Sequence, residues 1–132
     1  GAYIIDCIGN CRVNIIRDST VNFIKTLAAA RPNVPIIMIS NYFYKYMWID
    51  KVTYDRVYEE DSLWFSLYKQ MRSEGIKNLR FIYIGGNRDV KKFMKGAATG
   101  PDNEGSVDGD HLTDLGFLRM AEFLYPRLKK LK

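Results

Sequence analysis

The sequence predicts an α/β fold in which helices cover both faces of a parallel sheet. Short, continuously apolar stretches alternate along the chain with segments whose apolar residues recur at helical spacing. Continuous apolar stretches are typical of strands that are buried on both faces of a parallel sheet. The chain has 132 residues, 47% of them hydrophobic, so we expect a single domain over residues 1–132 with a substantial core.

The first half of the chain predicts two strands and one helix. AYIIDC, residues 2–7, is predicted to form the first strand, buried in the sheet, and IGNCRVN after it is expected to be a loop. The helix that follows has Asp18 or Ser19 as its candidate N-cap and ends before Pro32. The second strand is predicted over residues 34–40, with Pro35 near its start.

The second half predicts two helices and one strand. A helix over residues 59–75 ends at Gly75, since glycine readily ends helices, and a strand follows over residues 79–84. The polar, Gly-rich stretch 87–105 is expected to be mostly loop. The final helix spans residues 113–130, with Thr113 or Asp114 as its cap. Its predicted apolar face consists of Leu115, Leu118, Met120, Ala121, Leu124 and Leu128.

This order of elements corresponds to a flavodoxin-like, three-layer α/β/α arrangement with a parallel sheet. In such sheets, ligands bind beyond the carboxyl ends of the strands. The predicted strands end near residues 7–10, 40–42 and 85–87. A functional site is therefore expected where these three ends meet.

Composition argues against several classes of protein. Two cysteines, Cys7 and Cys11, and one histidine are too few for a zinc site, and DNEGSVDGD lacks the glycine of an EF-hand loop, so we predict no metal and no cofactor. The net charge of +5 is spread along the chain without a nucleic-acid-binding motif, so no nucleic-acid partner is expected. No apolar run is long enough to predict a membrane span.

The histidine, His111, lies in the stretch SVDGDHLTDLGFLRMAEFL, just before the final helix. Asp108 precedes it with D-x-x-H spacing, and a tight turn would bring that carboxylate against the imidazole. The carboxylate would then accept from one ring nitrogen and leave the other free to take a proton. From the residues alone, a proton-transfer site and an ordinary polar loop both remain open.

Several stretches resemble the SGNH/GDSL hydrolases. VDGDHLTDLGFLRM is similar to the family's last block, which implies that His111 is the catalytic base and Asp108 its partner, although Leu112 stands where many members have proline. YIIDCIGN resembles the G-x-N-D block, which implies that the Asn10 amide donates to the oxyanion. Ile8 and Cys11 depart from that block, where glycine and aspartate are usual.

The family's Gly-Asp-Ser block, which carries the nucleophilic serine, does not occur in the sequence. The resemblance therefore implies the C-terminal portion of an ester hydrolase, with N-terminal strands absent and no activity expected from this chain alone. It further implies an ester of a small molecule, carbohydrate or lipid as substrate, and favours a secreted or periplasmic location. Without its neighbouring strand, residues 2–7 would present an open edge, which predicts either pairing with a second copy of the chain or poor order of this segment.

An aromatic stretch, NYFYKYMW, follows the second predicted strand. Tyr42 and Tyr44 are candidate substrate-binding residues because aromatic faces stack on sugars and pack against acyl chains. Such residues also commonly cover a core or an interface. The other function that stays open is a non-catalytic, flavodoxin-like binding or interaction module, since fold alone does not assign activity.

Overall fold

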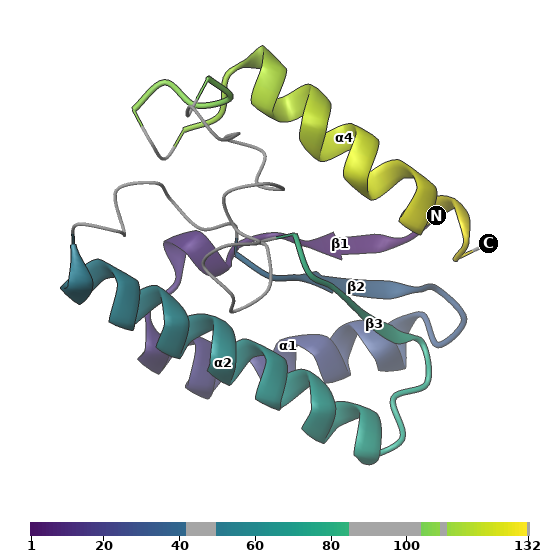
Figure 1. Ribbon diagram of the computed structural model, residues 1–132. Coiled ribbons are helices and arrows are strands. Elements are labelled where there is room, and N and C mark those ends of the chain that lie inside the picture. The colour runs from purple at the N-terminus through teal and green to yellow at the C-terminus, as the bar shows by residue number, and fades with distance from the viewer. Residues whose placement is uncertain (42–49, 85–103, 109–110, 132) are drawn as a thin grey trace. The chain divides into compact units, whose positions relative to one another are not determined.

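The computed structural model describes residues 1–41, 50–84, 104–108 and 111–131 (Figure 1). The chain forms two compact units, each of which is described by itself. The first consists of Gly1–Asn41 and Asp55–Ile82, and the second of Tyr42–Tyr54 and Tyr83–Lys132. The first unit contains the sheet.

The sheet has three parallel strands in the order β1-β2-β3, namely β1 (Tyr3–Ile5), β2 (Ile36–Ile39) and β3 (Leu79–Ile82). All four residues of β2 are buried, as expected for a central strand between two parallel neighbours. Each strand is slightly shorter than the sequence predicts. The predicted α/β fold with a parallel sheet is confirmed.

The first strand lies at one edge of the sheet. Within the described residues, β1 pairs only with β2, and Ile4 is 47% exposed. An apolar edge strand with unpaired backbone groups is a template for pairing with another chain. The predicted association through residues 2–7 therefore stays a prediction that this topology permits.

Helix α1 (Val13–Ala30) begins earlier than predicted. Arg12, not Asp18 or Ser19, is the N-cap residue, and its side chain makes no capping hydrogen bond. The extra turn places Ile16 on the same face as the buried Ile24, and both are fully buried. Burial of an apolar face stabilises a helix more than a single capping bond does, so the better capping residues lie inside the helix.

Helix α2 (Lys51–Ser73) also begins earlier than predicted. The Asp50 carboxylate accepts hydrogen bonds from the backbone N–H groups of Val52 and Thr53 at 3.1 and 3.3 Å, which satisfies two donors of the first turn. The predicted end at Gly75 is confirmed: its φ is 99°, a left-handed conformation that glycine adopts without strain. The chain then turns toward β3.

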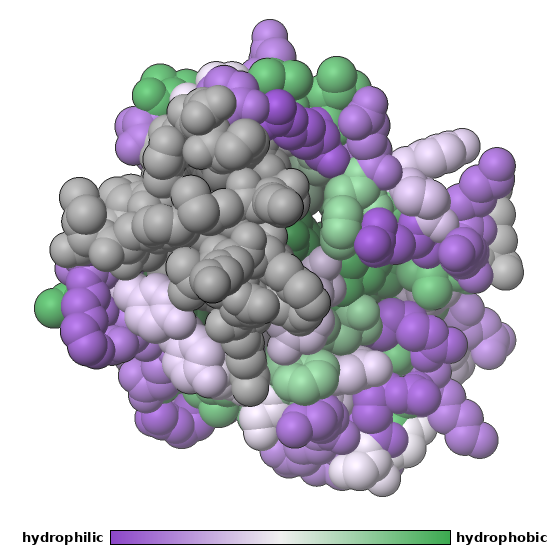
Figure 2. All heavy atoms as spheres, viewed as in Figure 1, coloured by the Kyte–Doolittle hydropathy of each residue, from purple (hydrophilic) through white to green (hydrophobic). Residues whose placement is uncertain are grey.

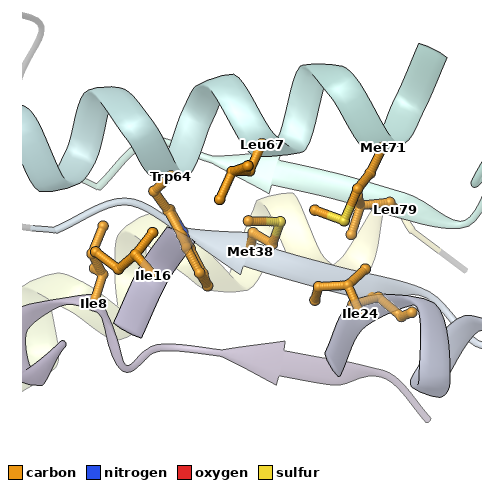
Figure 3. Packing of buried hydrophobic residues seen from close by; sticks show 9 residues of the cluster. Ile8, Ile16, Ile24, Met38, Trp64, Leu67, Met71 and Leu79 are labelled. Carbon is orange, nitrogen blue, oxygen red and sulfur yellow. The ribbon is translucent and has the colours of Figure 1, made fainter. Parts of the chain in front are cut away.

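Helices α1 and α2 lie together on one face of the sheet (Figure 1). Figure 3 shows their apolar side chains meeting Met38 of β2 and Leu79 of β3. Burying one such side chain contributes about 1.5–3 kcal/mol. The buried cluster comprises Ile8, Ile16, Ile24, Ile36, Met38, Trp64, Leu67, Met71 and Leu79.

Helix α4 (Asp114–Lys129) begins where predicted, with the Thr113 hydroxyl accepting from the Gly116 N–H. The less exposed face of α4 differs from the predicted one. Met120, Leu124 and Leu128 are half-buried as expected, whereas Leu115, Leu118 and Ala121 are exposed. Apolar and hydrophilic side chains both reach the surface at the top of Figure 2, where α4 lies. No helix in the described ranges is both long and apolar enough to cross a bilayer.

Candidate active site

Asp108 and His111 lie against each other on the loop that precedes α4. The Asp108 Oδ2 is 2.7 Å from the His111 Nδ1, and the Asp108 Oδ1 accepts a 2.8 Å hydrogen bond from the His111 backbone N–H. Two contacts to one carboxylate fix its orientation relative to the ring. The predicted contact between Asp108 and the imidazole of His111 is confirmed.

The pair is open to solvent, with 76% of the His111 side chain and 52% of the Asp108 side chain exposed. When the carboxylate holds Nδ1, the ring nitrogen left to exchange a proton is Nε2. A base must reach the atoms of its substrate, and an exposed ring can do so. An exposed pair also suits an ordinary loop, so the catalytic role of His111 stays a prediction.

Backbone hydrogen bonds hold the two sides of this loop together. The Val107 N–H donates to the His111 carbonyl at 2.8 Å, and the Thr113 N–H donates to the Gly105 carbonyl at 3.0 Å. The two bonds lie on either side of an antiparallel bridge between residues 106 and 112. They make the position of His111 depend on the segment 104–108, which carries its partner Asp108.

The same segment packs against the first turns of α4. Arg119 on α4 forms a 2.6 Å ion pair with Glu104. Gly116, one turn into the helix, lies so close to Gly105 that a Cβ atom at Gly116 would overlap the Gly105 carbonyl oxygen. The loop is therefore held by an ion pair, by backbone hydrogen bonds and by a contact that only glycine permits. None of these three restraints was predicted from the sequence.

Asn10 ends the 3₁₀ turn η1 (Ile8–Asn10), which follows β1 where a loop was predicted. Ile8 is 1% exposed and anchors the turn in the core. The Asn10 N–H donates to the Cys7 carbonyl and the Cys11 N–H donates to the Ile8 carbonyl, both at 3.0 Å. Among the described contacts the Asn10 side chain, which is exposed, makes no hydrogen bond. Its amide is thus presented to solvent on an anchored backbone.

Cys7 and Cys11 flank this turn as free thiols. Burial, together with the neighbouring Cys11 and Asp6, raises the pKa of the Cys7 thiol to about 11. A raised thiol pKa keeps the sulfur protonated at neutral pH, and only the thiolate is a nucleophile. Cys7 is thus expected to react more slowly with alkylating reagents than an equally exposed cysteine of ordinary pKa would.

We therefore expect iodoacetamide to alkylate Cys7 on the order of 100-fold more slowly at pH 8 than it alkylates the same cysteine in the urea-unfolded chain. The rate should rise steeply as the pH approaches 11. Peptide mass spectrometry after timed quenching follows Cys7 separately from Cys11. Equal rates in the folded and unfolded chains would show that the thiol is not suppressed.

A buried charge cluster that was not predicted from the sequence lies near the Asn10 turn. Glu60 on α2 is fully buried and accepts hydrogen bonds of 2.9 and 3.1 Å from Nη1 of Arg56. Arg12, two residues after Asn10, brings its Nη1 to 3.9 Å from the same carboxylate. The sequence does contain a signal for this cluster. Two acidic residues, Glu60 and Asp61, interrupt the otherwise apolar stripe of α2 that carries Trp64, and acidic residues on such a stripe indicate buried charge.

The remaining predicted site residues are not all described. Tyr42 and Tyr44 fall outside the described residues. Asn10 belongs to the first unit, and Asp108 with His111 to the second, so their arrangement at one edge of the sheet stays a prediction. In the part of the chain that is described, no group of three or more His, Cys, Asp and Glu side chains is arranged to hold a metal ion.

Comparisons with known proteins agree with the motifs on these loops. The chain matches the GDSL-like lipase/acylhydrolase family over residues 1–129. It is similar to the crystal structure of a protein from Bacteroides ovatus ATCC 8483 assigned as a GDSL-like lipase, with a TM-score of 0.83 and 32% sequence identity. That similarity covers 98% of this chain and 35% of the other, so this chain spans about a third of that protein's length. A comparison with curated proteins finds no match.

The family match covers nearly the whole chain, and the related structure shares its fold at an identity above 30%. Both agree with the resemblance that the segments around Asn10 and His111 carry. The chain belongs to the GDSL-like lipase/acylhydrolase family.

Proposed function

We propose that this chain supplies the base and one oxyanion donor of a serine ester hydrolase. The observation that carries the proposal is the contact of the Asp108 carboxylate with both the backbone N–H and the ring Nδ1 of His111. This pair lies on a loop that is held against α4. A carboxylate that holds one ring nitrogen of a histidine, with the other nitrogen exposed, is the arrangement that a serine nucleophile requires. Membership of an acylhydrolase family supports the same chemistry.

In the proposed reaction, the His111 Nε2 takes the proton of a serine hydroxyl as the oxygen attacks the ester carbonyl. Asp108 keeps the proton on Nδ1 and stabilises the imidazolium that forms. The Asn10 amide donates to the oxygen that becomes negatively charged, and an amide does so without adding charge. His111 then protonates the leaving alcohol, and water hydrolyses the acyl-enzyme in a second round of the same proton transfers.

We propose that the nucleophilic serine lies outside this chain, because none of its serines follows a Gly-Asp pair. The substrate class is an ester of a small molecule, a carbohydrate or a lipid. Tyr42 and Tyr44 are proposed to line the subsite for the acyl or sugar group. Association through β1 is also proposed, and sedimentation velocity of this chain over a range of concentrations tests it.

Hydrolysis of p-nitrophenyl acetate tests the proposal. We compare this chain with an extended protein, which adds the upstream segment that is proposed to carry the nucleophilic serine. Activity is expected in the extended protein only, and His111→Ala should remove it, since the base is then lost. Full activity in the His111→Ala variant, or binding of esters without turnover by the extended protein, would contradict the assignment.

A further inference from the structure

The buried stripe of α2 is apolar toward the C-terminus of the helix and polar toward its N-terminus. Leu67 and Met71 on this stripe make apolar contacts in the core, together with Trp64 (Figure 3). Toward the N-terminus of the helix, the Trp64 Nε1 donates to the Ile39 carbonyl at 3.0 Å, and the Asp61 Oδ1 accepts from the Asn41 N–H at 3.1 Å. Both partners lie at the carboxyl end of β2. Polar contacts therefore fasten α2 to the edge of the sheet where ligands bind in α/β folds.

Glu60 continues this stripe and is the most deeply buried charge on it, with its side chain 0% exposed. A buried carboxylate is costly unless it is paired and hydrogen-bonded. Arg56, one turn away on the same helix, bonds both carboxylate oxygens, and its side chain is 31% exposed. This pair would satisfy Glu60 without any contact outside α2.

The contact that crosses to another element is made by Arg12. Its Nη1 lies 3.9 Å from the Glu60 Oε1, while 66% of its side chain stays exposed. Arg12 follows Asn10 by two residues and occupies the N-cap of α1, where its carbonyl accepts the first helical hydrogen bond from Ile16. The backbone of Arg12 thus joins the Asn10 turn to α1, and its side chain reaches α2.

We propose that Arg12 is a positioning residue, which holds the Asn10 turn in place through its ion pair with the buried Glu60. One side of the turn is anchored by Ile8 in the core, and the pair with Glu60 anchors the other side. A side-chain donor stabilises an oxyanion only if it is held in place before the reaction. This inference rests on the proposed function, in which Asn10 is that donor.

A double-mutant cycle in the extended protein tests the inference, with kcat and KM measured for p-nitrophenyl acetate. Asn10→Ala should lower kcat by roughly 10²–10³-fold, the usual cost of losing one oxyanion donor. Arg12→Met should lower kcat on the order of 10-fold at unchanged KM, and Arg12→Lys should restore part of it. The double variant should be no slower than Asn10→Ala, because Arg12 acts through Asn10.

The matched control is Glu74→Gln. Glu74 forms a 2.7 Å ion pair with Lys25, which joins α1 to the far end of α2, and this change should leave kcat unaltered. Two outcomes would overturn the role of Arg12 without affecting the proposed function. One is that the losses in kcat are additive in the double variant, and the other is that Arg12→Met keeps its kcat while Asn10→Ala loses it. An unaltered kcat in Asn10→Ala would instead overturn the proposed role of Asn10.

A second readout needs no activity and uses the present chain. The backbone amides of Asn10 and Cys11 donate the two hydrogen bonds of the turn. Arg12→Met should speed their hydrogen exchange on the order of 10-fold, whereas Glu74→Gln should not. Glu60→Gln, if the variant folds, should behave as Arg12→Met does. Equal exchange in the Arg12→Met and Glu74→Gln variants would show that Arg12 does not hold the turn.

Discussion

Asp108→Asn is expected to lower kcat of the extended protein by about 10⁴-fold while leaving the fold intact. The reason lies in the two bonds that the carboxylate makes. The Asp108 Oδ1 accepts from the His111 backbone N–H, so an asparagine would keep its oxygen there. Its amide nitrogen would then face the His111 Nδ1, at the position of the Oδ2 that is 2.7 Å away.

An amide nitrogen only donates, so the Nδ1 facing it would have to accept. The ring proton would then move to Nε2, and a protonated Nε2 cannot take the proton of a serine. His111 is the only histidine in the sequence, which makes its ring nitrogen signals unambiguous in ¹⁵N NMR spectra of this chain. We expect the proton on Nδ1 in the natural sequence and on Nε2 in the Asp108→Asn variant.

Asp114→Asn is the matched control, since Asp114 is an exposed acidic residue in the first turn of α4. It should leave both the ring tautomer and kcat unaltered. If Asp108→Asn kept the natural tautomer and normal turnover in the extended protein, Asp108 would not be the partner that orients the base.

The sequence predicted most reliably what depends on neighbours along the chain. The contact between Asp108 and His111 spans three residues, so a tight turn was enough to anticipate it. The cap at Thr113 and the helix end at Gly75 are likewise local. The parallel sheet was predictable because its strands are mostly apolar, and the central strand β2, which is buried on both faces, is apolar throughout.

The predicted start of α1 was wrong because the local preference for capping residues competed with tertiary burial. Asp18 and Ser19 are good capping residues, but Ile16 ahead of them packs in the core, and that burial extends α1. The ion pair of Arg12 with Glu60 joins residues that are far apart in the sequence, so no spacing rule could reveal it. The close approach of Gly116 to Gly105 depends on how a loop folds back on a helix, which residue types do not encode.

Gly116→Ala should impair both stability and catalysis, although alanine is the better helix former by about 1 kcal/mol. The added methyl would overlap the Gly105 carbonyl oxygen and come within 3.1 Å of the Leu112 Cβ. Gly105 contributes backbone atoms, which cannot swing aside as a long side chain would, so the segment 104–108 must move. Overpacking of this kind typically costs about 1–3 kcal/mol, which outweighs the gain in helix propensity.

The movement would reach the proposed active site because Asp108 lies on the displaced segment, and the Gly105 carbonyl accepts from Thr113 at the start of α4. We expect a lower Tm and a changed His111 ring signal in this chain. In the extended protein, kcat should be at least about 10-fold lower, since a misplaced catalytic pair slows the reaction. Gly75→Ala is the control, because it strains a residue with φ of 99° but meets no atom within 4 Å. That variant should lose stability and keep both kcat and the ring signal. A Gly116→Ala variant more stable than the natural sequence, with an unaltered His111 signal, would mean that the loop does not press against α4.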